Sequence, residues 1–140
     1  MSDSRKSSGK IPIAPDVKFH PNGLILISLS SGAGDANLAR FIREELMREG
    51  RVFAGTDALI DAAGLESFNA EFIAVFADLL TQYKAKGGGR VMLVAKRSNI
   101  RMMAESLSAT CMAHDGPEIR IVATRDIGAN NLGRTLEEAV

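Results

Sequence analysis

Cys111, His114 and Asp115 come closer to a catalytic arrangement than any other residues in this chain. A cysteine thiolate acts as a nucleophile when a histidine base lies beside it and a carboxylate orients that histidine. Here Cys111 falls at the apolar-rich end of an expected helix, and nothing in the neighbouring sequence supplies an oxyanion hole. We therefore expect Cys111 to be a buried structural cysteine, not a nucleophile.

Metal and disulfide chemistry has even less support in the sequence. Cys111 is the only cysteine, so an intramolecular disulfide cannot form and thiolates cannot cluster around a metal. The two histidines, His20 and His114, stand far apart in the chain and lack metal-ligand spacing. The sequence therefore predicts no metal site, no cofactor and no enzymatic activity.

A glycine-containing segment, from Ser31 to Asp35, follows an expected strand and precedes an expected helix. Dinucleotide-binding loops lie at this position in a fold. The segment lacks the third glycine of that motif and the lysine of a P-loop, and Asp35 would repel a phosphate. Nucleotide or small-ligand binding through this segment is therefore kept only as an alternative.

A second glycine run, residues 87–89, stands beside Lys84, Lys86 and Arg90. Glycine next to basic side chains suggests anion binding, because the exposed backbone and the positive charges both attract a negative group. A flexible turn between a helix and a strand explains the same residues more simply.

Composition and charge exclude several classes of function. The chain has 140 residues, 46% of them hydrophobic and 24% charged, which fits one globular domain. Its formal net charge is zero, so we expect no general attraction to nucleic acid or to anionic lipid. The longest apolar run near the amino end, residues 24–27, is too short to insert in a membrane. With one cysteine and no signal peptide, the chain is expected to be cytoplasmic.

The patterning predicts an α/β domain over residues 17–140, preceded by a flexible arm over residues 1–16. A turn containing Asn22 and Gly23 should join two strands, 17–20 and 24–29, as a hairpin. Further strands are expected at 58–62, 91–95 and 119–123. Helices are expected from the cap Asp35 to about residue 49, from the cap Asn69 to about 86, and from the cap Ser98 to about 112.

After the last strand, the sequence predicts a long loop over residues 124–134. Thr135 and Glu138 then form a capping box for a short final helix. The order is β-β-α-β-α-β-α-β-α, which favours a mixed, mainly parallel sheet with right-handed crossovers.

This order of elements resembles the STAS domain, the fold of bacterial anti-sigma factor antagonists and of the cytoplasmic tail of sulfate transporters. The resemblance covers residues 17–140. It rests on four stretches that occur in the family's order. The first two are Gly34-Asp35-Ala36-Asn37, and Leu59-Ile60-Asp61 followed by Gly64-Leu65. The last two are Tyr83-Lys84-Ala85-Lys86-Gly87-Gly88 running into Val91-Met92-Leu93-Val94, and Thr135-Leu136-Glu137-Glu138-Ala139.

The resemblance implies a regulatory site at the amino end of the second long helix. The family carries there an aspartate, a serine, a serine or alanine, and a glycine, and its first serine is phosphorylated by a kinase that is also the anti-sigma factor. This chain has Asn69, Ala70, Glu71 and Phe72 at those positions. Because alanine has no hydroxyl, the standard switch cannot operate at Ala70. Ser67 is an alternative acceptor, although an ordinary loop serine explains it more simply.

The leading hypothesis is a non-catalytic regulatory module that acts by protein–protein contact in bacterial signalling or transcription regulation. The implied partner is an anti-sigma factor or a kinase-like regulator. The partner-binding residues are then expected to be Ser31, Asp35, Ser67, Asn69, Ala70 and Glu71. The alternatives are a small-ligand or nucleotide-binding domain, and a structural subunit that forms a homo-oligomer through residues 124–134 and the amino-terminal arm.

Overall fold

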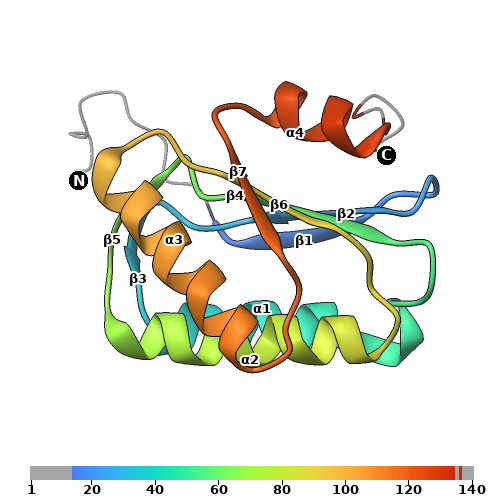
Figure 1. Cartoon of the computed structure of the whole chain (residues 1–140), viewed down its shortest axis with the longest axis horizontal. Helices are drawn as coiled ribbons and strands as arrows, with labels where there is room; N and C mark the ends of the chain where they lie inside the picture. Colours follow the sequence, from blue (N-terminus) through green and yellow to red (C-terminus); the bar gives the residue numbers. More distant parts are fainter. Residues whose placement is uncertain (1–13, 135, 137–140) are drawn as a thin grey trace, which may run out of the picture.

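The computed structural model describes residues 14–134 and residue 136, and it has a five-stranded mixed sheet at its centre (Figure 1). The strands are β1 (Asp16–Phe19), β2 (Leu24–Ser28), β4 (Asp57–Asp61), β6 (Val91–Val94) and β7 (Ile119–Val122), and they lie in the order β1-β2-β4-β6-β7. Only β1 runs antiparallel to its neighbour, whereas all other pairs are parallel. The predicted α/β class and mainly parallel sheet are confirmed.

The hairpin between β1 and β2 turns where the sequence predicts it. Asn22 Oδ1 accepts a hydrogen bond from the backbone N–H of Leu24 at 3.0 Å, and Gly23 has a φ of 91°. That positive φ is the conformation that glycine adopts without strain. The turn therefore sets the register in which Phe19 faces Ile25.

Three helices, α1 (Ala36–Leu46), α2 (Ala70–Ala85) and α3 (Ser98–Ala113), lie on one side of the sheet (Figure 1). A short 3-10 helix, η2 (Arg48–Gly50), follows α1. The helices bury an apolar core against every second residue of the central strands, as the two-residue period of a strand requires. Phe72 and Phe76, one turn apart on α2, stack in this core with ring centroids 5.3 Å apart.

A smaller apolar cluster fills the opposite face of the sheet, where α4 (Arg125–Leu132) covers it (Figure 1). Leu59 and Met92 from the strands meet Leu132 from α4. Gly128 allows the close approach, since a Cβ at this position would lie 2.6 Å from the side chain of Leu59. No helix in the described part of the chain is long and apolar enough to cross a membrane.

Several sequence-based expectations about the elements are wrong. The expected loop over residues 124–134 is mostly the helix α4, capped by Thr124, whose Oγ1 accepts from the N–H of Ile127 at 3.2 Å. Its low apolar content and the two asparagines in its last turn hide it in the sequence. Ser98 does not cap α3, because the N-cap residue is Arg97 and no side chain bonds that helix start. The sequence also missed two short strands, β3 (Gly32–Gly34) and β5 (Leu65–Phe68).

Two other expectations fall largely outside the described residues. The predicted arm over residues 1–16 overlaps the structure only at residues 14–16, and Asp16 already belongs to β1. The capping box of Thr135 and Glu138 lies on residues that the structure does not describe.

Candidate functional site

The predicted partner-binding segments meet in a second, two-stranded parallel sheet. β3 and β5 pair so that Ala33 lies opposite Ser67 and Gly34 opposite Phe68. A side chain at position 34 would be crowded, since a Cβ there would lie 3.3 Å from both Leu65 Cδ2 and the carbonyl oxygen of Ser67. The pairing brings two segments that are more than thirty residues apart in the sequence to one end of the molecule.

Two helices begin directly from this small sheet, and each has a side-chain cap. Asp35 Oδ1 accepts from the N–H of Leu38 at 3.0 Å, at the start of α1. Asn69 Oδ1 accepts from the N–H of Phe72 at 2.8 Å, at the start of α2. The Asn69 N–H donates to the carbonyl of Gly34 at 3.1 Å, which ties the start of α2 to β3. Each cap satisfies a backbone donor that the helix itself cannot.

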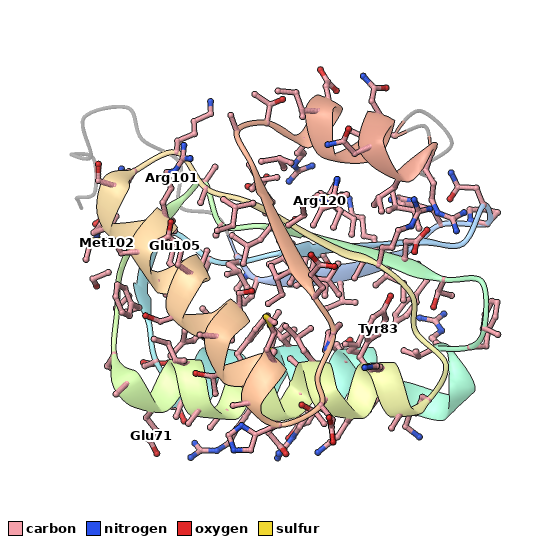
Figure 2. All side chains as sticks on the ribbon, in the orientation of Figure 1. Glu71, Tyr83, Arg101, Met102, Glu105 and Arg120 are labelled. Atoms are coloured by element: carbon pink, nitrogen blue, oxygen red, sulfur yellow. The ribbon has the colours of Figure 1, made fainter. Side chains whose placement is uncertain are left out.

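An ion pair links the two helix starts on the outside of the molecule. Arg40 on α1 lies 3.6 Å from a carboxylate oxygen of Glu71 on α2, and Arg40 also donates to Asn37 Oδ1 at 3.1 Å. Both partners are about half exposed, so the pair contributes a few tenths of a kcal/mol. Glu71 points out of the molecule below α2 (Figure 2), and its charge is therefore presented to solvent together with a neighbouring cation.

The structure brings together five of the six residues that the sequence singled out. Ser67, Asn69, Ala70 and Glu71 are exposed, and Asp35 is half-buried beside them. Ser31 precedes β3 at the strand end opposite to Asp35. We call the group formed by Asp35, Ser67, Asn69, Ala70 and Glu71 the helix-start surface.

Arg40 completes the charge pattern of the helix-start surface, and sequence reasoning missed it. Arg40 and Glu71 lie on different helices, and no spacing rule connects residues 31 positions apart. The strand β3 was missed because Gly32-Ala33-Gly34 has none of the β-branched or aromatic residues that are enriched in strands.

The nucleotide-binding alternative loses its main support in this geometry. A phosphate bound by a glycine-rich loop accepts hydrogen bonds from backbone N–H groups at the start of the following helix. Here the Asp35 carboxylate already accepts the N–H of Leu38, and residues 32–34 are extended and paired with β5. The segment therefore serves as a strand and a cap.

The remaining reactive side chains have structural explanations. Cys111 is fully buried, and burial raises the pKa of its thiol to about 11, so the thiol stays protonated near neutral pH. His114 is exposed, and its Nδ1 lies 2.9 Å from the carbonyl of Thr110. Burial raises the pKa of Tyr83 to about 12. Within the described residues no cluster of three metal-ligating side chains occurs.

No family model matches the sequence, and no curated protein matches it either. Solved structures do match its fold. SpoIIAA, an anti-sigma factor antagonist, gives a TM-score of 0.58 in its unphosphorylated form at 16% identity, over 86% of this chain and 98% of that chain. Its phosphorylated form from Bacillus gives 0.59 at 16% identity, over 85% and 99%.

Two further structures show the same likeness. A protein of Thermotoga maritima, described as a candidate anti-sigma factor antagonist, gives a TM-score of 0.60 at 14% identity, over 86% of this chain and 95% of that chain. A Shewanella loihica protein with a SpoIIAA-like fold gives 0.55 at 11% identity, over 89% and 98%. These likenesses show that the chain has the STAS-type fold that its element order resembles.

Proposed function

We propose that this chain is a regulatory module of the anti-sigma factor antagonist kind, which binds a protein partner through the helix-start surface and catalyses no reaction itself. The observation that carries the proposal is the placement of five predicted contact residues, from β5, α2 and the α1 cap, on one exposed surface at one end of the fold. Hydrogen-bonded caps on both helices preorganise this surface, which lowers the entropy lost on binding.

The charge at the helix-start surface does not depend on phosphorylation at the position of Ala70. A phosphoserine carries about two negative charges near neutral pH, whereas Ala70 cannot accept a phosphate. Glu71 supplies one fixed negative charge on the next residue, and Arg40 partly neutralises it at 3.6 Å. Binding by the proposed module therefore does not depend on a kinase acting at residue 70.

A partner-binding titration tests this proposal. A pull-down from the native host identifies the partner, and calorimetry then measures its affinity for the wild type, for Ala70→Asp and for Glu71→Lys. Ala70→Asp adds a carboxylate beside Glu71, and we expect it to weaken binding roughly tenfold through like-charge repulsion. The fold should persist, since negative charge is tolerated at a helix start.

Glu71→Lys should also change the affinity, because it removes the fixed negative charge and places a second cation beside Arg40. Its cost in stability should be only a few tenths of a kcal/mol, as the pair is exposed. Glu105→Lys is the matched control, since Glu105 is exposed on α3, away from Glu71 (Figure 2). Unchanged affinity in both test variants, with normal circular dichroism, would show that the partner docks elsewhere.

A further inference from the structure

A hollow of about 400 Å³ lies at the amino ends of β6 and β7, at the other end of α2 from the helix-start surface. Its wall includes Lys84 from the last turn of α2, Arg120 from β7 and Asn131 from α4. Figure 2 places Arg120 on the side of the sheet that faces α4. We call this feature the basic hollow, and its lining residues are Lys84, Gly88, Gly89, Arg90, Val91, Met92, Pro117, Glu118, Arg120 and Asn131.

One wall of the basic hollow is held rigidly by packing and hydrogen bonds. A Cβ on Gly88 would lie 2.4 Å from the ring of Tyr83, and one on Gly89 would lie 2.6 Å from a carboxylate oxygen of Asp57. The N–H of Gly89 donates to the Tyr83 hydroxyl at 3.1 Å, and the N–H of Arg90 donates to Asp57 Oδ1 at 2.7 Å. Gly88 and Gly89 therefore form a wall that is fixed by these contacts, and a preformed wall is typical of small-molecule sites.

Positive charge is concentrated around the basic hollow. Three cations, Lys84, Arg90 and Arg120, line it together with one carboxylate, Glu118. The carboxylate of Asp57 pairs with both Arg90 and Arg134, so it offsets only one of their two positive charges and the surplus of positive charge remains. Since the whole chain has a formal net charge of zero, this surplus is a local property of the hollow.

Two of these cations have donors left for a ligand. The Arg120 side chain is exposed and forms no ion pair or hydrogen bond with another residue in the described part of the chain. The Lys84 ammonium makes one long contact of 3.4 Å, to the carbonyl of Gly116. A guanidinium and an ammonium are the groups that bind phosphate most often, the first through a planar pair of N–H donors.

We propose that the basic hollow binds a small molecule that carries a phosphate group, which Lys84 and Arg120 attract from the two sides of the sheet from which they line the hollow. A hollow of about 400 Å³ is larger than a phosphate alone and falls in the size range of small-ligand pockets. The rest of the ligand fills the remaining space of the hollow, whose lining also includes Met92 and Pro117. This site is separate from the helix-start surface and does not depend on the proposed partner.

A phosphate titration of the full chain, followed by ¹H–¹⁵N NMR, tests the site. Sodium phosphate is the probe, and sodium chloride at equal ionic strength is the reference, because salt screens exposed charges. We expect saturable shifts at the amides of Gly88, Gly89 and Arg120. Lys84→Gln and Arg120→Gln should each weaken the phosphate affinity about tenfold, as expected for the loss of one charged hydrogen-bond donor.

Arg101→Gln is the matched control, since Arg101 is an exposed arginine of α3 that lies away from Arg120 (Figure 2). Its phosphate affinity should equal that of the wild type, and circular dichroism should show all three variants folded. Shifts that grow linearly without saturation, or an equal loss in Arg101→Gln, would overturn the proposal. Ala70→Asp should leave the phosphate shifts unchanged, so this test and the partner titration fail independently.

A second arm of the experiment separates a free phosphate compound from a lipid headgroup. Vesicles of phosphatidylcholine with phosphatidic acid are sedimented with the protein. We expect the protein to stay in the supernatant while inorganic phosphate gives saturable shifts. Sedimentation that depends on Arg120, without saturable shifts from inorganic phosphate, would assign the hollow to a membrane surface and overturn the proposal.

Discussion

On one face of the sheet, α1, α2 and α3 bury a broad apolar core, whereas on the other face α4 combines a small apolar cluster with arginine–aspartate pairs at both of its ends. The first face contains the largest fully buried side chains, among them Phe72, Phe76 and Tyr83. The second has Leu132 as the main anchor of its helix. The same sheet is therefore covered on one face chiefly by hydrophobic burial and on the other by a smaller apolar cluster together with directed polar contacts.

The pairs that hold α4 start from the two ends of β4. At the amino end, Asp57 accepts from Arg134 Nε at 3.0 Å and from an Arg90 guanidinium nitrogen at 3.1 Å. At the carboxyl end, Asp61 accepts from Arg125 Nε at 2.5 Å, and Arg125 also donates to the Ser28 hydroxyl at 3.2 Å. One strand thus fixes both ends of one helix, and the register of α4 on the sheet follows.

Among the variants that remove contacts of α4, Asp57→Ala should lower the free energy of unfolding the most. The Asp57 side chain is 7% exposed, and its loss leaves Arg90 and Arg134 without a counter-ion. Because both arginines keep some solvent contact, we expect a loss of about 2–4 kcal/mol in the free energy of unfolding, at or below the range for a fully buried pair. Urea unfolding measures this loss.

Hydrogen exchange shows which face the Asp57→Ala variant weakens. We expect faster exchange in α4, while amides in the core of α2 lose only what the global destabilisation accounts for. Phe76→Ala is the matched control, since it should cost about 3–5 kcal/mol and affect both faces together. Equal exchange across α2 and α4 in Asp57→Ala would show that the two faces do not differ in how they are held.

Asp61→Ala should have a smaller effect of about 1–2 kcal/mol. The Asp61 side chain is 16% exposed, so water compensates part of the lost contacts to Arg125 and to the N–H of Ala63. The same urea titration measures it, and Arg125→Gln should reproduce most of the loss. A loss equal to that of Asp57→Ala would mean that burial does not set the strength of these pairs.

The smallest effect concerns pH and His20, which lies opposite Leu24 at the end of the β1–β2 hairpin. Its Nε2 is buried and has no hydrogen-bond partner among the described residues. Burial, and secondly the charge of Lys18, lower the pKa of His20 from its ordinary value of 6.5. The unfolded chain therefore binds the proton more readily, and stability is lost as the pH falls below about 6.5 towards the lowered value.

Urea unfolding at a series of pH values measures this loss, and one proton contributes a slope of at most about 1.4 kcal/mol per pH unit. His20→Leu should flatten the curve between neutral and mildly acid pH. His114→Gln, at an exposed histidine, is the control and should leave the slope in place. A slope that His20→Leu does not change would assign the acid sensitivity to carboxylates.

Patterns within one element predicted most of the fold, and contacts between elements were the part they could not predict. The three- and four-residue spacing of Phe72, Phe76, Leu79 and Tyr83 identifies α2, and the turn at Asn22 and Gly23 identifies the hairpin. The caps at Asp35 and Asn69 were predicted from residue type and are confirmed by their hydrogen bonds. In each case the signal is local and one physical cause dominates.

The elements that the sequence did not predict also have a common cause. α4 is held in place by Asp57 and Asp61, which its own sequence does not contain, and β3 is extended because β5 lies beside it. Tertiary contacts override weak local preference in both elements. The role of the helix-start surface in partner binding stays a prediction.

The contacts of α4 also constrain the order in which the chain can fold. Arg134 and Asp57 are 77 positions apart, and Arg125 and Asp61 are 64 apart. Loops this long close slowly, and during synthesis α4 emerges from the ribosome after every strand of the sheet. Until then the Asp57 and Asp61 carboxylates and the apolar residues Leu59 and Met92 have no covering helix. A nascent chain stalled before residue 125 would expose this face to chaperones, and completion of α4 would hide it.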